Sequence, residues 1–136
     1  MIRNRRGMTL LEIMIVLAIV ASLIGILAGQ IRGRMKKAQM NQAKIQIGEL
    51  SKALDNYYTD CNSYPPESEG FQALVSQPTS CTNWGPEPYL KRLPKDPWGQ
   101  DFIYKSNGSS FSILSYGADK KEGGAGEGAD ISSETM

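Results

Sequence analysis

A long apolar run follows the first few residues of the chain. From Leu10 to Ile31 the only formally charged side chain is Glu12. As an α-helix this run spans about 33 Å, close to the hydrocarbon thickness of a bilayer. The pattern therefore predicts a membrane-spanning helix that carries a single carboxylate.

The segment that follows is amphipathic. Its apolar side chains recur in steps of three and four, at Met40, Ala43, Ile47, Leu50, Leu54 and Tyr57. This spacing places them on one face of a helix, with polar residues on the other face. We expect the helix to continue to about Tyr58 and to pack its apolar face against a small core. Gly25, Gly29 and Gly33 favour either close approach of another helix or local melting.

Short elements and turns make up the rest of the chain. Residues 69–75 predict a second helix, and residues 101–105 and 111–116 predict two strands joined by a turn at 107–110. The apolar positions of these strands alternate, at Phe102, Tyr104, Phe111 and Ile113. One face of the hairpin should therefore pack on the amphipathic helix, which indicates an α+β fold. We expect residues 96–99 (Asp-Pro-Trp-Gly) to form a structural turn that places the tryptophan in the core.

Composition narrows the functional classes. The chain has 15 Lys and Arg, 14 Asp and Glu, and no His. Loss of Arg3, Arg5 and Arg6 would leave 12 basic against 14 acidic residues, a net charge of −2. This balance gives no basic footprint for nucleic acid. Without His the chain lacks the commonest general base and the commonest metal ligand, so we do not expect an enzyme.

Glu12 requires a partner, because a carboxylate inside a bilayer is costly. It lies five residues after Gly7, which ends a short basic leader. Cleavage between Gly7 and Met8 would create an amine that can pair with this carboxylate. Two other interpretations are a secretory signal peptide, cut near residues 28–29, and a signal anchor that is never cut.

Residues 5–12 (Arg-Arg-Gly-Met-Thr-Leu-Leu-Glu) resemble the class III signal of type IV pilins and of the pseudopilins of type II secretion. The resemblance implies that a prepilin peptidase cuts after Gly7 and methylates Met8, where these families usually have Phe. It also implies that Glu12 meets the N-terminal amine of a neighbouring subunit. The expected organisation is a leader at 1–7, a membrane and filament-core helix at 8–31, and a periplasmic head at 32–136.

Three later segments sharpen the resemblance to the major pseudopilin of type II secretion. They are residues 64–78, residues 93–102 with the element Pro-Lys-Asp-Pro-Trp-Gly, and residues 115–131. The resemblance implies a pilin-like fold and a structural subunit of a periplasmic pseudopilus that drives protein export. The implied partners are copies of the chain in a helical filament, minor pseudopilins, the inner-membrane assembly platform and the prepilin peptidase.

The same resemblance implies a single-pass inner-membrane location, with the N-terminus in the cytoplasm before cleavage and the filament in the periplasm afterwards. Two other functions stay open. One is a type IV pilin subunit for motility, adhesion or DNA uptake. The other is a membrane-anchored periplasmic binding module, which would be a monomer indifferent to mutation of Glu12.

The C-terminal segment suggests a calcium loop. Carboxylates spaced among glycines, together with backbone carbonyls, supply the hard oxygen ligands that Ca²⁺ prefers. From composition alone, a flexible Gly-rich tail is the competing interpretation. The resemblance favours calcium, and the expected metal site is Tyr116, Asp119, Lys121, Glu127 and Asp130.

Cys61 and Cys81 are the only cysteines. In a segment placed outside the cytoplasm, an even pair predicts a disulfide that closes the intervening loop. Two buried free thiols are the alternative.

Overall fold

The computed structural model describes residues 7–136, except for the side chain of Glu127. It contains two compact units, Met1–Lys37 and Ala38–Met136. Helix α1, Leu10–Cys61, contributes residues to both units. It is helical through Gly25, Gly29 and Gly33, so local melting at these glycines is wrong. Nothing lies within 4 Å of a side chain built at any of the three, which leaves room for close approach of another helix.

Specific residues define both ends of α1. At its start, Thr9 Oγ1 accepts a hydrogen bond of 3.2 Å from the amide of Glu12, as an N-cap residue does. At its end, Asn62 adopts a left-handed conformation (φ 57°) and its amide donates to the carbonyl of Tyr58 at 2.8 Å. Asn is one of the few residues that tolerate this conformation after a helix. The helix therefore runs three residues past the predicted end at Tyr58.

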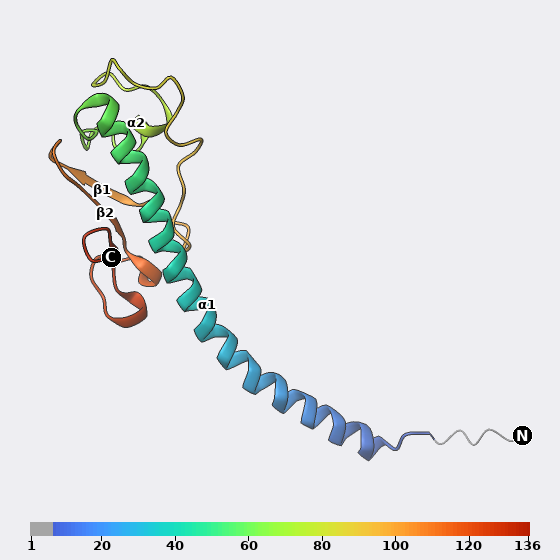
Figure 1. Ribbon diagram of the computed structural model, residues 1–136. Helices are drawn as coiled ribbons and strands as arrows, with labels where there is room; N and C mark the ends of the chain where they lie inside the picture. The colour runs from blue at the N-terminus through green and yellow to red at the C-terminus, as the bar shows by residue number, and fades with distance from the viewer. Residues whose placement is uncertain (1–6) are drawn as a thin grey trace, which may run out of the picture. The chain divides into compact units, whose positions relative to one another are not determined.

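The head contains a three-stranded antiparallel sheet (Figure 1). Strands β1 (Ile103–Ser106), β2 (Phe111–Ser115) and β3 (Ile131–Ser132) lie in the order β1-β2-β3. Tyr104 pairs with Ile113, so both side chains occupy the same face, as the alternation predicted. This long helix and small antiparallel sheet confirm the expected α+β, pilin-like fold. Strand β3 was not predicted, because two residues cannot show an alternating pattern.

The amphipathic half of α1 forms the centre of the head core. Ile47, Leu50, Leu54 and Tyr57 are at most 1% exposed, which confirms the predicted apolar face. The sheet covers this face with Ile113, and Phe102 just before β1 adds to it. The segment between helix and sheet contributes Leu74, which is fully buried.

Helix α2 is only one turn long, Gln72–Val75, rather than the predicted 69–75. Gly70 has φ 53°, a left-handed value that a right-handed helix cannot contain. The Trp84 indole nitrogen donates to the carbonyl of Ala73 at 2.7 Å, and Leu90 donates its amide to the carbonyl of Leu74. These bonds fasten the loop between helix and sheet to α2.

The turn at residues 96–99 is structural, as predicted. Asp96 is only 4% exposed, and its Oδ1 accepts amide hydrogen bonds from Trp98 at 3.1 Å and Gln100 at 2.7 Å. Its Oδ2 accepts a hydrogen bond of 2.9 Å from the hydroxyl of Ser115 on β2. Gly99 supplies the positive φ (83°) that the turn needs, and Trp98 packs against the core.

Candidate functional site

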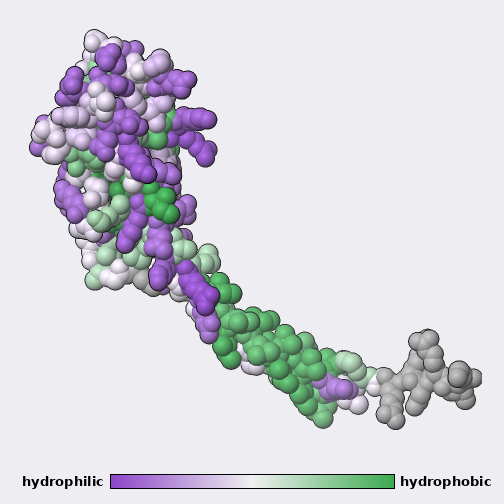
Figure 2. Space-filling view, viewed as in Figure 1, coloured by the Kyte–Doolittle hydropathy of each residue, from purple (hydrophilic) through white to green (hydrophobic). Residues whose placement is uncertain are grey.

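The N-terminal half of α1 exposes an apolar surface. Its large hydrophobic side chains in the Leu10–Ile31 run are between 43% (Ile13) and 80% (Leu10) exposed. Figure 2 shows this surface as a continuous hydrophobic stretch on the visible face. Among the described residues, this is the one helix long and apolar enough to cross a membrane. Such a surface is unfavourable in water and requires either lipid or other protein chains around it.

Glu12 lies exposed within this apolar surface. Gly7 and Met8 lie just before the N-cap residue Thr9 and are also exposed, Met8 by 65%, so the peptide bond between them is accessible. The rest of the predicted leader, residues 1–6, lies outside the described part of the chain. Thr9, the residue that fixes the start of the helix, was not predicted from the sequence. The Thr-x-x-Glu spacing of a capping box was the available signal.

The cysteine pair is joined. Cys61 and Cys81 form a disulfide with a Cα–Cα distance of 5.5 Å, which confirms the prediction and excludes free thiols. The disulfide ties the end of α1 to the loop that carries Trp84. Beside it, the Tyr89 ring contacts Trp84 edge-on at 5.6 Å, and its hydroxyl donates to Asp60. Burial, and then the hydrogen bond to Asp60, raise the pKa of Tyr89 above its usual value.

The C-terminal loop consists of two short 3₁₀ turns, η1 (Gly117–Asp119) and η2 (Gly126–Gly128), packed against each other. Asp119 Oδ1 accepts the amide of Lys121 at 3.1 Å, and Asp130 Oδ2 accepts the amide of Gly123 at 2.8 Å. The other oxygen of Asp130, Oδ1, is buried and has no hydrogen-bond partner. A buried carboxylate oxygen without a partner is costly, and a cation would satisfy it.

Gly124 lets the carboxylate of Asp119 lie close to the backbone of this loop. A β-carbon at Gly124 would clash with the carbonyl oxygen of Gly128 and lie 2.7 Å from Asp119 Oδ2. Both oxygens therefore lie beside the same glycine, in a conformation (φ 108°) that side chains rarely adopt. Only a glycine at this position lets a carboxylate and a carbonyl converge so closely.

These oxygens fit a hard cation only in part. Among the described side chains, no three His, Cys, Asp or Glu residues form a cluster, and the side chain of Glu127 lies outside that description. Tyr116 directly precedes η1, and the amide of Lys121 is engaged with Asp119. Since a phenol and an ammonium are poor calcium ligands, these two residues could contribute only their backbone carbonyls.

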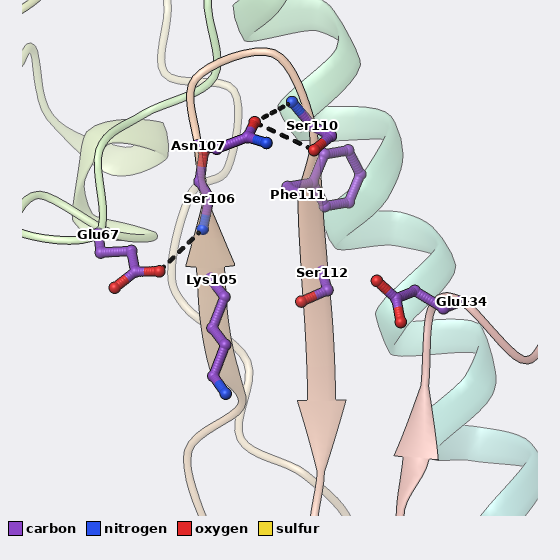
Figure 3. Close-up of a pocket in the computed structure, with 8 residues that line it drawn as sticks. All are labelled: Glu67, Lys105, Ser106, Asn107, Ser110, Phe111, Ser112 and Glu134. Atoms are coloured by element: carbon purple, nitrogen blue, oxygen red, sulfur yellow. Dashed lines mark hydrogen bonds between the residues drawn. The ribbon is translucent and has the colours of Figure 1, made fainter.

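A pocket of about 270 Å³ lies at the hairpin end of the sheet (Figure 3). Its charged lining residues are Glu67, Lys105 and Glu134. Polar groups in it already serve the fold, because Glu67 Oε1 accepts the amide of Ser106 at 3.2 Å and Asn107 Oδ1 accepts the amide of Ser110 at 2.8 Å. We assign no separate function to this pocket.

Comparison with known proteins identifies the chain. Its fold matches the crystal structure of the major pseudopilin from the type 2 secretion system of enterohaemorrhagic Escherichia coli, with a TM-score of 0.67 and 34% identity over 77% of this chain and 94% of that chain. Residues 2–28 match the prokaryotic N-terminal methylation motif. The fold and this motif define a pilin-like protein with an N-terminal apolar helix. Residues 30–134 match the family model of type II secretion system protein G. The chain therefore belongs to the type II secretion system protein G family.

Relatives match over nearly the whole length. The type II secretion system core protein G of Vibrio cholerae is 41% identical over 95% of this chain and 91% of its own length. The core protein G of Pseudomonas aeruginosa is 40% identical over 95% of this chain and 94% of its own. The similarity therefore covers both the apolar helix and the head.

Proposed function

We propose that this chain, a pseudopilin of type II secretion, is the structural subunit of a periplasmic pseudopilus whose growth drives protein export. The observation that carries the proposal is the exposed apolar surface of residues 10–31, which contains one carboxylate and overlaps a methylation motif. A bilayer would cover this surface before assembly. In the filament, the same surface of neighbouring subunits would cover it.

The first step in this function is processing. A prepilin peptidase would cut the exposed bond between Gly7 and Met8 and methylate the new amine of Met8. The product would lie in the inner membrane as a single-pass protein, with its N-terminus on the cytoplasmic side and its head in the periplasm. Inside the apolar environment, the amine and the carboxylate of Glu12 are both costly unless they are paired.

Assembly supplies that pairing between subunits. The Glu12 amide already bonds to Thr9 within the helix, whereas the carboxylate projects from an exposed position where a neighbour can reach it. An incoming subunit would then be guided by the contact between its amine and the Glu12 carboxylate of the previous one. The other proposed partners are the minor pseudopilins and the inner-membrane assembly platform.

Replacement of the carboxylate tests this step. Glu12→Gln keeps the shape of the side chain and removes the charge, so we expect normal insertion but at least a tenfold lower yield of filaments. Ser22→Ala is the matched control in the same apolar run. The Ser22 hydroxyl donates a hydrogen bond of 2.7 Å to the carbonyl of Ile19 in its own helix, so it is not needed by a neighbouring subunit. The yield is measured by shearing and immunoblotting of filaments from cells that express the secretion machinery.

Intact mass shows whether a failure lies in processing or in assembly. Both variants and the unchanged chain should lose residues 1–7 and carry one methyl group on Met8. Normal filament yield from processed Glu12→Gln would overturn the pairing. Absence of filaments from the processed, unchanged chain would favour a membrane-anchored binding module. A mature start near residues 28–29, or a retained leader, would overturn the pseudopilin processing itself.

We also propose that the C-terminal loop binds Ca²⁺ through Asp119 and Asp130, with backbone carbonyls and Glu127 completing the site. The support is the unpartnered, buried Oδ1 of Asp130 and the position of Asp119 Oδ2 and the Gly128 carbonyl oxygen beside the same glycine, Gly124. The bound ion would neutralise two carboxylates in the loop that leads into strand β3. It would thereby hold this strand, Ile131–Ser132, on β2.

Thermal unfolding of the full chain in detergent tests the calcium site. At a hundred times Kd, a ligand stabilises the folded state by about 2.7 kcal/mol, so Ca²⁺ should raise the Tm clearly and Mg²⁺ much less. Asp130→Asn should abolish most of the increase. Asp101→Asn, an exposed carboxylate elsewhere on the head, should leave it unchanged. If a chelator does not lower the Tm, the loop is a Gly-rich tail without a metal.

A further inference from the structure

A group of basic residues directly follows the membrane-spanning run. Arg32, Arg34, Lys36 and Lys37 lie within six positions, and we call them the basic collar. All four are exposed. Between Glu12 and Glu49 the sequence contains no acidic residue at all. The collar is therefore a local concentration of positive charge along the helix.

The collar lies on two opposite sides of the helix rather than on one face of it. Successive residues of an α-helix are rotated by about 100°, so Arg32 and Lys36 leave the axis on one side, and Arg34 and Lys37 leave it on the opposite side. Along the axis, the collar occupies only about 8 Å. A docked protein would contact one side of the helix and leave the opposite charges unused. Charges on both sides at one depth instead fit a partner that encloses the helix in a plane.

The depth of the collar agrees with a bilayer as that partner. The apolar run spans about 33 Å, so its far end coincides with the end of the hydrocarbon layer when its start lies at the opposite interface. The collar begins at the next residue, at the level of the lipid phosphates. Arg guanidinium groups bind phosphate oxygens in a bidentate manner, and Lys binds them as a point charge.

We infer that the basic collar binds the headgroups of anionic phospholipids in the periplasmic leaflet. This inference rests on the proposed membrane insertion and adds the lipid class that the inserted subunit recognises. Anionic lipids around the collar would fix the depth of the helix. They would also oppose release of the subunit from the membrane, since these contacts must break before the helix enters a filament.

Lipid selectivity of the full chain tests the inference. The protein is reconstituted in vesicles of phosphatidylcholine and phosphatidylglycerol at a ratio of four to one, and spin-labelled versions of each lipid report which one contacts the protein. We expect at least threefold preference for phosphatidylglycerol over phosphatidylcholine at low salt and loss of this preference in 1 M NaCl. The triple variant Arg32→Gln/Arg34→Gln/Lys37→Gln should show no preference.

A second triple variant controls for the loss of net charge. Lys52→Gln/Lys91→Gln/Lys105→Gln removes three exposed cations from the head and should retain the preference. Equal loss in both triple variants, or no preference in the unchanged chain, would overturn the inference. Flotation of carbonate-washed vesicles reports insertion separately. A chain that does not float would contradict the proposed membrane state, whereas a floating chain without lipid preference would contradict the collar alone.

Discussion

Asp96 shows how one carboxylate organises the centre of the head. It is 4% exposed and joins the turn that contains Trp98 to Ser115 on β2. Charged groups are rarely buried to this extent unless they are fully hydrogen-bonded. The sequence identified the turn, because its Asp-Pro-x-Gly pattern is local. It could not identify Ser115 as a partner, because that residue is distant along the chain and its hydroxyl gives no pattern.

Removal of this carboxylate should be costly. Asp96→Ala leaves the amides of Trp98 and Gln100 and the hydroxyl of Ser115 without their acceptor. We expect the free energy of unfolding to fall by about 3 kcal/mol or more, since hydrogen bonds to charged groups contribute about 1.5–3 kcal/mol each.

Urea unfolding followed by near-ultraviolet circular dichroism measures the change. Asp101→Ala is the control, because its contact with Lys95 is 3.6 Å long and both side chains are well exposed. Such a surface ion pair should contribute less than about 1 kcal/mol. A loss of similar size in both variants would show that Asp96 has no special role.

At the scale of elements, the disulfide replaces secondary structure in the loop after α1. The described structure between Cys61 and β1 contains only the single turn of α2. The sequence predicted a longer helix here, at residues 69–75. The positive φ of Gly70 ended that extension, and only the structure shows it. The loop is held instead by the cystine and by hydrogen bonds such as that from Trp84 to Ala73.

Reduction should therefore destabilise the head measurably. A cross-link that closes a loop of this length contributes about 3 kcal/mol in the chain-entropy model. The double variant Cys61→Ser/Cys81→Ser should have a lower Tm than the oxidised chain, by about 12–24 °C for a domain of this size. Dithiothreitol should lower the Tm of the unchanged chain to a similar value and leave that of the double variant unaltered. A Tm insensitive to both would show that the loop is held without the cross-link.

On the scale of the whole head, tyrosine hydroxyls connect different segments of the chain, and three of them belong to phenols whose pKa is raised. Tyr64 donates to Asp55 at 3.0 Å, Tyr89 donates to Asp60, and Tyr104 donates to the carbonyl of Pro65 at 2.8 Å. Burial is the main cause that raises the pKa of each tyrosine, and nearby carboxylates add to the increase at Tyr64 and Tyr89. The folded head therefore favours the neutral phenols.

These shifts predict sensitivity to alkali. Because the pKa of each phenol is higher in the folded than in the unfolded chain, the folded state holds its protons more tightly. The resulting stability is complete below about pH 10, the unfolded value, and is lost as the pH rises through the folded pKa values. The urea concentration at the unfolding midpoint should therefore decrease as the pH rises above about 10.

One variant shows how much of this pH dependence comes from a single phenol. Tyr89→Phe should reduce the pH dependence, because it removes one of the shifted phenols together with its bond to Asp60. Tyr116→Phe, which removes a phenol that contributes to none of the three shifts, is the matched control and should retain the pH dependence of the unchanged chain. An unchanged pH dependence in Tyr89→Phe would contradict the assignment.

The sequence predicted the elements with strong periodicity and missed the contacts between them. The membrane-spanning helix follows from an uninterrupted apolar run. The buried helix face that contains Ile47 and Leu54 follows from apolar residues spaced by three and four, and the hairpin follows from apolar residues at every second position. The third strand and the bonds of Tyr64 and Asp96 depend on tertiary packing, which no local pattern encodes. For the candidate sites, Glu12 was conspicuous because a charge interrupts an apolar run. The N-cap residue Thr9, in the same segment, was not recognised from the sequence.

Trp84 is an intrinsic fluorescent probe of the region around the disulfide. Its indole nitrogen bonds to the Ala73 carbonyl at 2.7 Å, and its ring lies 5.6 Å from that of Tyr89. The chain has two tryptophans, so Trp98→Phe would leave Trp84 as the single emitter. Indole emission moves to longer wavelength when water replaces a protein acceptor. The emission of Trp84 in the Trp98→Phe variant would therefore show whether the loop around the disulfide stays ordered during assembly. No dye need be attached to a surface that neighbouring subunits contact.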